Sequence, residues 1–407
     1  MHKFSISLLW DCNEKCLFCA KGPPPRGVKR RLSEEEALEL VLDKRAEGCD
    51  ILAFDGGEPT LLPYLPELAG RALHAGYKQV HILTNAVALS DNNMVLALLK
   101  CHPKAKKLIH FGVSLHAHLK KDSEHLTRSA GTFERTLTGI RNLNAAGFPT
   151  TLYHVITART YRKLPAFSAF MLKNMPGIRG ITFSFIFPAE HFRRHMNIFP
   201  RITEIAPFFD RAINLLRASG VIVNMSSCGM VPFCLFNGNE RLLIRSFARD
   251  NSAGAASYDT HKSEAFPFFL ENFQRMNKIK SAVCGACVLD PVCGGIWKMY
   301  AERYGLGELK PYTTGYFKKQ PFSGAAGTIN MDHGDNYPDP AAYLRISMAA
   351  LRWDGIRDIG LKGRLPRGIS ADEISLFASA LGCRLAAGAP NRKDKGLTRD
   401  FHHNTGV

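Results

Sequence analysis

Apolar runs and amphipathic segments alternate along the first half of the chain. Short runs with little polar interruption are typical of buried parallel strands, and the longer segments between them carry apolar residues at helical spacing. Strands that alternate with helices indicate a parallel sheet with right-handed crossovers, built here from six strand–helix units. The pattern predicts strands at residues 4–9, 50–54, 79–84, 108–114, 151–156 and 180–187, and helices at residues 33–47, 65–75, 92–99, 131–146, 164–172 and 203–218.

Polar or glycine-rich stretches follow the first four predicted strands. Three cysteines come after the first strand, Gly-Gly-Glu-Pro after the second, Thr84-Asn85 after the third and Ser114-Leu-His116 after the fourth. Parallel β/α barrels place their chemistry at the carboxyl ends of the strands. Because all four stretches fall on that rim, we expect them to form one site.

The first of these stretches, Cys12-Asn-Glu-Lys-Cys16-Leu-Phe-Cys19, has the spacing C-x3-C-x2-C. Thiolates are soft ligands that select zinc, copper(I) or iron–sulfur clusters. A closed zinc site takes four ligands, and only three cysteines occur here before Cys49. A 4Fe–4S cluster held by three cysteines keeps one iron open to bind and activate another molecule. A zinc knuckle or a reactive loop is the alternative interpretation of these residues taken alone.

This cysteine motif, with the aromatic Phe18 before its third cysteine, resembles the cluster motif of the radical S-adenosylmethionine (radical SAM) enzymes. The stretch Gly56-Gly57-Glu58-Pro59 resembles the same family's Gly-Gly-Glu-Pro motif, which contacts the amino group of S-adenosylmethionine. The two glycines let the backbone approach a ligand closely, and an acidic side chain beside the cluster suits an ammonium group. The resemblance implies an α/β fold, a partial (β/α)6 TIM-type barrel, which agrees with the six strand–helix units. It also implies two cofactors, S-adenosylmethionine and a 4Fe–4S cluster on the three cysteines.

Four further positions belong to the predicted cofactor site. By the same resemblance, Thr84, Asn85 and Ser114 hold the ribose and the carboxylate of S-adenosylmethionine. Arg128 follows the fourth strand and is a candidate partner of that carboxylate, which a guanidinium binds as a bidentate fork. A solvated arginine at a helix start is the alternative interpretation of Arg128.

The sequence contains two pairs of closely spaced histidines. His116 and His118 would share one face if the fourth strand continued past Ser114, and there they would touch substrate or shuttle protons. His191 and His195 are four residues apart but follow a proline. We interpret this second pair as surface positions rather than metal ligands.

A second cysteine group includes Cys284, Cys287 and Cys293, with the spacing C-x2-C-x5-C. It resembles the SPASM and twitch extensions, which bind auxiliary clusters, but Trp297 replaces the fourth cysteine of the full SPASM pattern. Too few ligands remain for two auxiliary clusters, so we expect one auxiliary 4Fe–4S cluster with Cys234 as its fourth ligand. A four-cysteine zinc site is the alternative.

The other cysteines add less. Cys228 is the second choice for the fourth ligand, and Cys49, Cys101 and Cys383 are expected to be buried free thiols. The chain has 11 cysteines, and their metal-type grouping favours a reducing cytosol over a disulfide framework. We therefore expect a cytoplasmic protein.

We expect three domains: a radical SAM partial barrel at residues 1–220, a small auxiliary cluster domain at residues 221–320, and a linker with a helical, partly irregular tail at residues 321–407. A strand is expected at residues 221–225. The stretch after Pro321 has turn chemistry and no period. Ser370-Ala-Asp-Glu373 has the pattern of a capping box and predicts the start of a helix.

Composition narrows the class of partner. The 407 residues include 53 Lys and Arg against 36 Asp and Glu, for a net charge of +17. A basic balance favours anionic partners such as RNA or acidic peptide, but the charge is spread along the chain and no aromatic-rich RNA module is visible, so nucleic acid is not favoured. No apolar run approaches the roughly 18 residues that span a bilayer. We expect no membrane association and no signal peptide.

Taken together, these features predict a radical SAM enzyme. The resemblance implies that the reduced cluster cleaves S-adenosylmethionine to a 5′-deoxyadenosyl radical, which takes hydrogen from a substrate, with an external one-electron donor of the flavodoxin or ferredoxin type. A peptide or protein side chain is the expected substrate, because SPASM and twitch relatives often modify peptides. RNA or a small-molecule cofactor precursor is the alternative substrate. A metal- or iron–sulfur-binding regulator is the non-enzymatic alternative.

Overall fold

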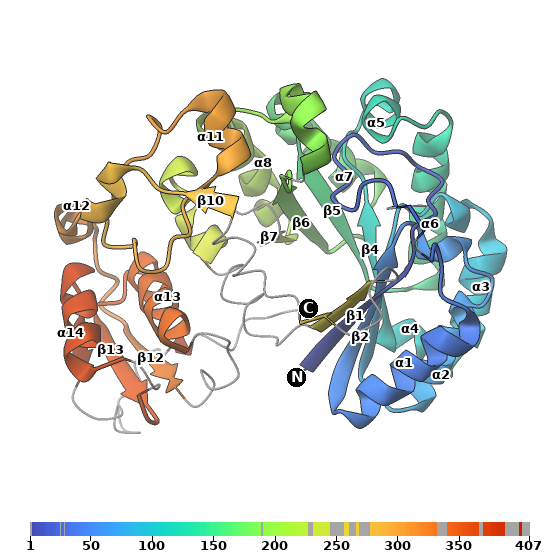
Figure 1. Cartoon of the computed structure of the whole chain (residues 1–407), viewed down its shortest axis with the longest axis horizontal. Coiled ribbons are helices and arrows are strands. Elements are labelled where there is room, and N and C mark those ends of the chain that lie inside the picture. Colours follow the sequence, from blue (N-terminus) through green and yellow to red (C-terminus); the bar gives the residue numbers. More distant parts are fainter. Residues whose placement is uncertain are drawn as a thin grey trace. The chain divides into compact units, whose positions relative to one another are not determined.

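The computed structural model describes residues 2–24, 26–27, 29–188, 190–226, 231–244, 256–259, 266–267, 277–331, 340–365, 369–386 and 399–400. The chain divides into two compact units (Figure 1). The first comprises Met1–Met230 and Ala255–Phe269, and the second comprises Val231–Gly254 and Leu270–Val407. The domain limits expected from the sequence, after residues 220 and 320, stay predictions.

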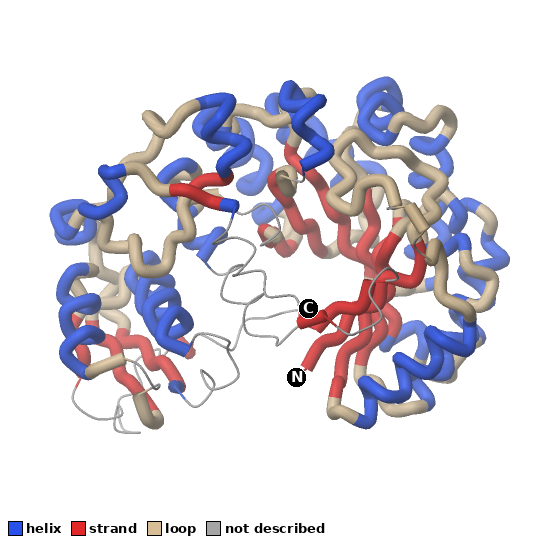
Figure 2. The backbone as a smooth tube through the Cα atoms, viewed as in Figure 1, coloured by secondary structure: helices blue, strands red, loops and turns tan. Residues whose placement is uncertain are grey.

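The first unit is built on one sheet with the strand order β7-β6-β5-β4-β3-β2-β1-β8-β9. Strands β1 to β7 pair in parallel with their neighbours in sequence. Figure 2 shows the strands of this unit in red, side by side. The α/β partial barrel is therefore confirmed, and it continues through a seventh strand. The sequence did not predict β8, which pairs in parallel with β1, or β9. The bounds are β1 (His2–Leu9), β2 (Cys49–Gly56), β3 (Gln79–Thr84), β4 (Ile109–Ser114), β5 (Thr150–Ile156), β6 (Gly180–Phe185), β7 (Ile222–Met225), β8 (Ala256–Asp259) and β9 (Phe266–Pro267).

Helices connect these strands, and two of them, the one-turn helix α4 and the helix α5, were not expected. The capping box at Ser33 and Glu36 begins α1 as predicted, but α5 has the polar sequence KKDSEHLT, whose few apolar positions give no helical period. Among the described residues, no helix is long and apolar enough to cross a membrane. The helices are α1 (Glu34–Ala46), α2 (Leu65–His74), α3 (Asn92–Lys100), α4 (Ala105–Leu108), α5 (Lys120–Thr127), α6 (Thr132–Ala146), α7 (Leu164–Asn174) and α8 (Ala206–Ala218), with short 3-10 turns η1 (Pro59–Leu61), η2 (Ala88–Ser90), η3 (Tyr161–Lys163), η4 (Glu190–Ile198) and η5 (Ile202–Glu204).

The two faces of the sheet differ in polarity. Along β4 and β5, every second residue is buried and the residues between are half-buried. The buried face packs on the helices: His154 of β5 lies 4.3 Å from the Phe167 ring of α7, and Phe183 of β6 lies 5.1 Å from the Phe209 ring of α8. The opposite face carries polar residues such as Tyr153, which lies over Gly112. The inner face of the partial barrel is therefore suited to a polar ligand.

The second unit contains a parallel sheet that the sequence did not predict. The stretch after Pro321 was expected to be irregular, but β12 (Ala326–Asn330), β13 (Asp358–Lys362) and β14 (Arg384–Ala386) pair in parallel, with α13 (Pro340–Trp353) and α14 (Ala371–Ala380) between them. These strands are only three to five residues long, too short to show a period. The capping box at Ser370 and Glu373 is confirmed. The remaining elements are η6 (Phe233–Leu235), η7 (Ala282–Ala286), β10 (Lys278–Ile279), β11 (Ile296–Trp297), β15 (Arg399–Asp400), α11 (Lys298–Tyr304) and α12 (Thr314–Lys319).

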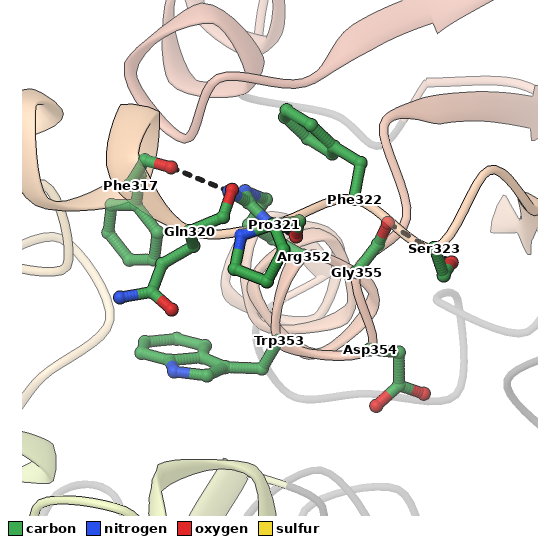
Figure 3. Close-up of a pocket in the computed structure, with 9 residues that line it drawn as sticks. All are labelled: Phe317, Gln320, Pro321, Phe322, Ser323, Arg352, Trp353, Asp354 and Gly355. Atoms are coloured by element: carbon green, nitrogen blue, oxygen red, sulfur yellow. Dashed lines mark hydrogen bonds between the residues drawn. The ribbon is translucent and has the colours of Figure 1, made fainter.

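A buried arginine holds the helices of this unit together. Arg352 is 2% exposed, and its guanidinium donates to the carbonyl oxygens of Phe317 (2.6 Å) and Gln320 (2.9 Å) at the end of α12 and of Leu381 (3.0 Å) after α14. Helix ends leave such carbonyls without partners, and a cation is favoured beside them. A pocket of about 300 Å³ opens beside Arg352 (Figure 3). Because these carbonyls engage its guanidinium, we assign Arg352 a structural role.

Candidate functional site

The loop that carries the first three cysteines leaves β1 at its carboxyl end and is held by backbone hydrogen bonds. The N–H groups of Lys15 and Leu17 donate to the carbonyl oxygens of Thr127 (2.9 Å) and Leu126 (2.8 Å) in the last turn of α5. Those carbonyls have no partner within the helix. The unpredicted helix α5 is thus a support for the cysteine loop.

The three cysteines of this loop are free thiols. The Sγ atom of Cys12 accepts the N–H of Glu14 at 3.4 Å, and Cys16 donates to the Glu14 carboxylate at 3.5 Å. Desolvation raises the pKa of the Cys12 thiol to about 12, with Glu58 and Glu14 adding negative charge, and it raises the pKa of Cys16 well above its ordinary value. A cysteine that binds a metal must be deprotonated to the thiolate. The positive charge of the iron ions in a bound cluster would stabilise these thiolates, which the buried, acidic surroundings disfavour.

No three described His, Cys, Asp or Glu side chains converge closely enough to hold a single metal ion. A 4Fe–4S cluster is larger than one ion and spaces its ligands more widely. The thiols of the loop are therefore compatible with a cluster.

Glu58 lies at the centre of a buried hydrogen-bond network. Its carboxylate, 1% exposed, accepts the N–H of Thr60 (3.1 Å), the hydroxyls of Thr60 (2.5 Å) and Thr84 (2.6 Å), and the N–H of Asn85 (2.7 Å). Both Thr60 donors and the Thr84 hydroxyl share one carboxylate oxygen, Oε1, and the Asn85 N–H donates to the other, Oε2. Burial raises the pKa of Glu58, and the hydrogen bonds oppose that shift. The expected contact of Glu58 with the cofactor's amino group stays a prediction.

Asn85 connects this network to the cysteine loop. Its side-chain N–H groups point to the Asn13 side-chain oxygen at 2.6 Å and to Cys12 Sγ at 3.8 Å, while its side-chain oxygen accepts the N–H of Val87 at 3.0 Å. The ends of β2 and β3 and the cysteine loop therefore meet, as the shared rim predicts. The following residue, Ala86, has φ 60°, a left-handed conformation that costs a non-glycine residue about 1–3 kcal/mol.

The glycines of the Gly-Gly-Glu-Pro stretch pack against the chain itself. A Cβ on Gly57 would lie 2.0 Å from the carbonyl oxygen of Asp11, and one on Gly56, at φ 125°, would lie 2.5 Å from that of Leu9. The same two carbonyls accept backbone hydrogen bonds: the N–H of Gly57 donates to Leu9 at 2.6 Å, and the N–H of Glu58 donates to Asp11 at 2.9 Å. The close approach expected of these glycines is thus made to the cysteine loop. Pro59 begins the turn η1 that follows.

Arg128 and Ser114 stand at the same end of the sheet. Arg128 is exposed, has φ 51°, and directly follows the Thr127 carbonyl that holds the loop. Ser114 is the half-buried last residue of β4. Their expected contacts with the cofactor remain predictions.

The fourth strand does not continue to the two histidines that follow it. Strand β4 ends at Ser114, so the condition for a shared face is not met; His116 is buried and His118 is half-buried. The His116 ring meets Phe18 edge-on at 4.5 Å and accepts the N–H of Val155 at 3.0 Å. Burial lowers the pKa of His116 to about 3, which keeps the ring neutral. His116 therefore supports Phe18 in the cysteine loop.

One contact to the loop was missed from the sequence. His191, in η4, donates from Nε2 to the carbonyl oxygen of Cys19 at 2.8 Å. Gly22, at φ 66°, gives the ring room, since a Cβ there would lie 2.8 Å from it. His191 and Cys19 are 172 positions apart in the sequence, so no local signal reveals their contact. His191 is a surface residue, as expected, but it touches the site.

The second cysteine group lies within the second unit. Cys234 interacts electrostatically with Cys293, Cys287 and Cys284, so all four lie near one another. The backbone N–H of Tyr312 donates to the Cys287 thiol at 3.4 Å, and the backbone of Gly295 and of Lys310 opposes the rise that burial causes in the pKa of Cys293 and of Cys234. Such hydrogen bonds to sulfur are among the protein features that tune iron–sulfur clusters. The arrangement fits one cluster, while Cys228 lies outside the described residues.

A buried cation accompanies this group. Lys278 of β10 is 7% exposed, and its Nζ lies 4.6 Å from the centroid of the Trp297 ring in β11. Burial lowers the pKa of Lys278 to about 8, and the charge of Cys293 opposes that shift. Of the remaining cysteines, Cys49 and Cys383 are buried as expected, whereas Cys101 is half-buried.

Comparison with known proteins places the first unit in a family. Residues 10–170 match the family model of the Radical SAM superfamily. Fe-coproporphyrin III synthase of Methanosarcina barkeri is 32% identical over 155 residues, which cover 38% of this chain and 37% of that protein. The chain thus spans little more than a third of that relative. The AdoMet-dependent heme synthase of the same organism is 23% identical over 333 residues, 74% of this chain and 93% of that protein.

The crystal structure of Streptococcus suis SuiB bound to S-adenosylmethionine has the same fold, with a TM-score of 0.54 and 15% identity over 76% of each chain. The matched residues 10–170 contain the cysteine loop, the Glu58 network and the support from α5. Residues 10–170 of the chain thus form a region that matches the radical SAM superfamily of enzymes.

Proposed function

We propose that this chain is an enzyme that binds a 4Fe–4S cluster on Cys12, Cys16 and Cys19 and cleaves S-adenosylmethionine reductively. The family match across residues 10–170 carries the proposal. When bound, the cluster and S-adenosylmethionine supply a 5′-deoxyadenosyl radical that takes a hydrogen atom from substrate. An external one-electron donor of the flavodoxin or ferredoxin type would supply the electron.

The chain's own residues would position these groups. The α5 carbonyls and His191 hold the cysteine loop from two sides. Glu58 ties the ends of β2 and β3 to one another, and Asn85 links them to Cys12. Exposed Arg128 and half-buried Ser114 remain available for the carboxylate and ribose of the cofactor. The polar inner face of the sheet would receive the substrate.

Anaerobic reconstitution tests the proposal. The wild-type protein should hold about eight irons with matching acid-labile sulfide if two clusters bind, and it should form 5′-deoxyadenosine with dithionite. Replacing Cys12, Cys16 and Cys19 together by alanine should leave about four irons and abolish 5′-deoxyadenosine. Replacing Cys49, which is buried and apart from both groups, should change neither result. Zinc without sulfide in the wild-type protein would refute the proposal.

We also propose one auxiliary 4Fe–4S cluster on Cys234, Cys284, Cys287 and Cys293. The proximity of Cys234 to the other three thiols and the N–H that Tyr312 donates to Cys287 support it. The sequence similarity to SPASM and twitch extensions points the same way.

For the substrate, we propose a peptide or protein side chain, supported by the SPASM-like spacing of Cys284, Cys287 and Cys293. A small-molecule precursor such as a tetrapyrrole is the second candidate, because the alignment with the AdoMet-dependent heme synthase covers 93% of that protein. Incubation of the reconstituted enzyme with a peptide encoded beside its gene, and separately with iron coproporphyrin, distinguishes the two by mass spectrometry. Product from the porphyrin alone would refute the peptide proposal.

A further inference from the structure

Lys278 and Trp297 face one another across two short antiparallel strands, β10 and β11. Lys278 of β10 is the register partner of Trp297 of β11, and its ammonium lies 4.6 Å from the indole centroid. An ammonium group taken out of water is costly unless something offsets its charge. An aromatic face attracts a cation by about 0.5–2 kcal/mol, which holds the ammonium group in place.

The same pair of strands brings this cation near Cys293. Lys278 and Cys293 interact electrostatically. Gly295, at φ 87°, lets the two strands close, because a Cβ there would lie 2.2 Å from the Ile279 carbonyl oxygen. Trp297 occupies the position at which the full SPASM pattern has its fourth cysteine. In this chain the residue at that position is an indole ring in contact with the Lys278 ammonium group.

We propose that Lys278 is a positioning residue for charge at the auxiliary cluster, where its ammonium makes the cluster easier to reduce. This inference rests on the proposed auxiliary cluster. A cluster with four thiolate ligands is anionic, and it gains one further negative charge when it takes up one electron. A fixed cation stabilises the more negative form more strongly. Net charge is one of the features that set cluster potentials.

The redox step itself is simple. The oxidised cluster takes one electron from a low-potential donor and becomes the reduced cluster, while no bond to protein breaks and Lys278 keeps its proton. The effect of Lys278 is therefore on the equilibrium between two oxidation states. Replacement of this lysine by a neutral residue should lower the midpoint potential.

The reconstituted full-length protein, titrated at pH 7 with dithionite and followed by electron paramagnetic resonance, tests this inference. Lys278→Met should reduce the equilibrium constant for cluster reduction about tenfold, which is a shift of about −59 mV for one electron. Lys278→Arg keeps the charge and should restore the wild-type potential. Lys280→Met is the matched control: Lys280 also interacts electrostatically with Cys293, but it is partly exposed and paired with Asp290 at 2.8 Å, so its shift should be smaller.

Three outcomes would overturn the inference. The first is an unchanged potential in Lys278→Met with full iron content. The second is an equal shift in Lys280→Met. If Lys278→Met loses iron, Lys278→Gln replaces it, and loss of iron in both neutral variants would make Lys278 necessary for assembly instead. If the variant that lacks Cys12, Cys16 and Cys19 holds no iron, the auxiliary cluster itself is absent. Iron analysis separates this failure from the other outcomes.

Discussion

The exchange Glu58→Gln tests what the buried carboxylate does. Four donors from Thr60, Thr84 and Asn85 lie 2.5–3.1 Å from its two oxygens. Glutamine offers one oxygen in place of two, so at least one buried donor loses its acceptor. A hydrogen bond to a charged group contributes about 1.5–3 kcal/mol. Because burial raises the pKa of Glu58, removal of the charge regains part of that loss. We expect the free energy of unfolding to fall by about 1.5 kcal/mol.

A double-mutant cycle with Thr84→Val then separates a direct role in cofactor binding from an indirect one. Thr84 donates to Glu58 at 2.6 Å and accepts the N–H of Ala86 at 2.9 Å. If Glu58 acts through Thr84 and Asn85, each single change weakens the same contacts at the end of β3. The second change then adds little to the rise in Kd that the first one causes. We expect a coupling of about 1.4 kcal/mol, which is a tenfold departure from additivity in the Kd for S-adenosylmethionine.

Calorimetric titration of S-adenosylmethionine into anaerobically reconstituted single and double variants measures this coupling. Thr138→Val is the control, because Thr138 is half-buried on α6 and its hydroxyl donates to the Glu134 carbonyl of the same helix at 3.0 Å. Additive effects on Kd, with binding abolished in Glu58→Gln and stability unchanged, would refute the positioning argument. That result would instead support direct contact between Glu58 and the cofactor's amino group.

Three further predictions concern single positions. Cys234→Ala should lower the iron content from about eight to about four per chain and spare slow 5′-deoxyadenosine formation; retention of all iron would show that another residue is the fourth ligand. Gly57→Ala should destabilise the protein by about 1–3 kcal/mol in urea denaturation, because its Cβ would lie 2.0 Å from the Asp11 carbonyl oxygen, whereas Gly307→Ala, with nothing within 4 Å, should change stability little. Asp122→Asn should cost about 1.5–3 kcal/mol at pH 7. Burial raises the pKa of Asp122, but its two cationic partners hold it below its ordinary value, so its contribution is present above about pH 4 and is lost as the pH falls further. Equal losses at pH 7 and pH 3 would contradict this assignment.

Short-range patterns predicted much of the fold. The boundaries of β3 agree with the apolar run at residues 79–84, and the capping boxes before α1 and α14 are where the spacing of Ser and Glu places them. These features depend on residues within a few positions of one another. Prediction failed where the local signal was weak: α5 has few apolar positions, and β12 to β14 are too short to show a period.

The alternation of elements also located the site, because parallel strands bring their carboxyl ends to one rim. From this rule and the cysteine spacing, the local sequence already placed Cys12, Gly57, Glu58 and Asn85 together. The rule does not say how side chains meet, however. Glu58 and Thr84 are 26 positions apart, and their hydrogen bond depends on the register of two neighbouring strands.

Longer-range partners were decided by the path of the chain alone. The carbonyls of α5 hold a loop more than a hundred residues earlier, His191 reaches Cys19, and Lys278 meets Trp297 through hairpin pairing. No residue type announces these contacts, because a backbone carbonyl is present at every position and a lysine is usually on the surface. Only packing removes water from such groups, and without water each must find a partner within the protein.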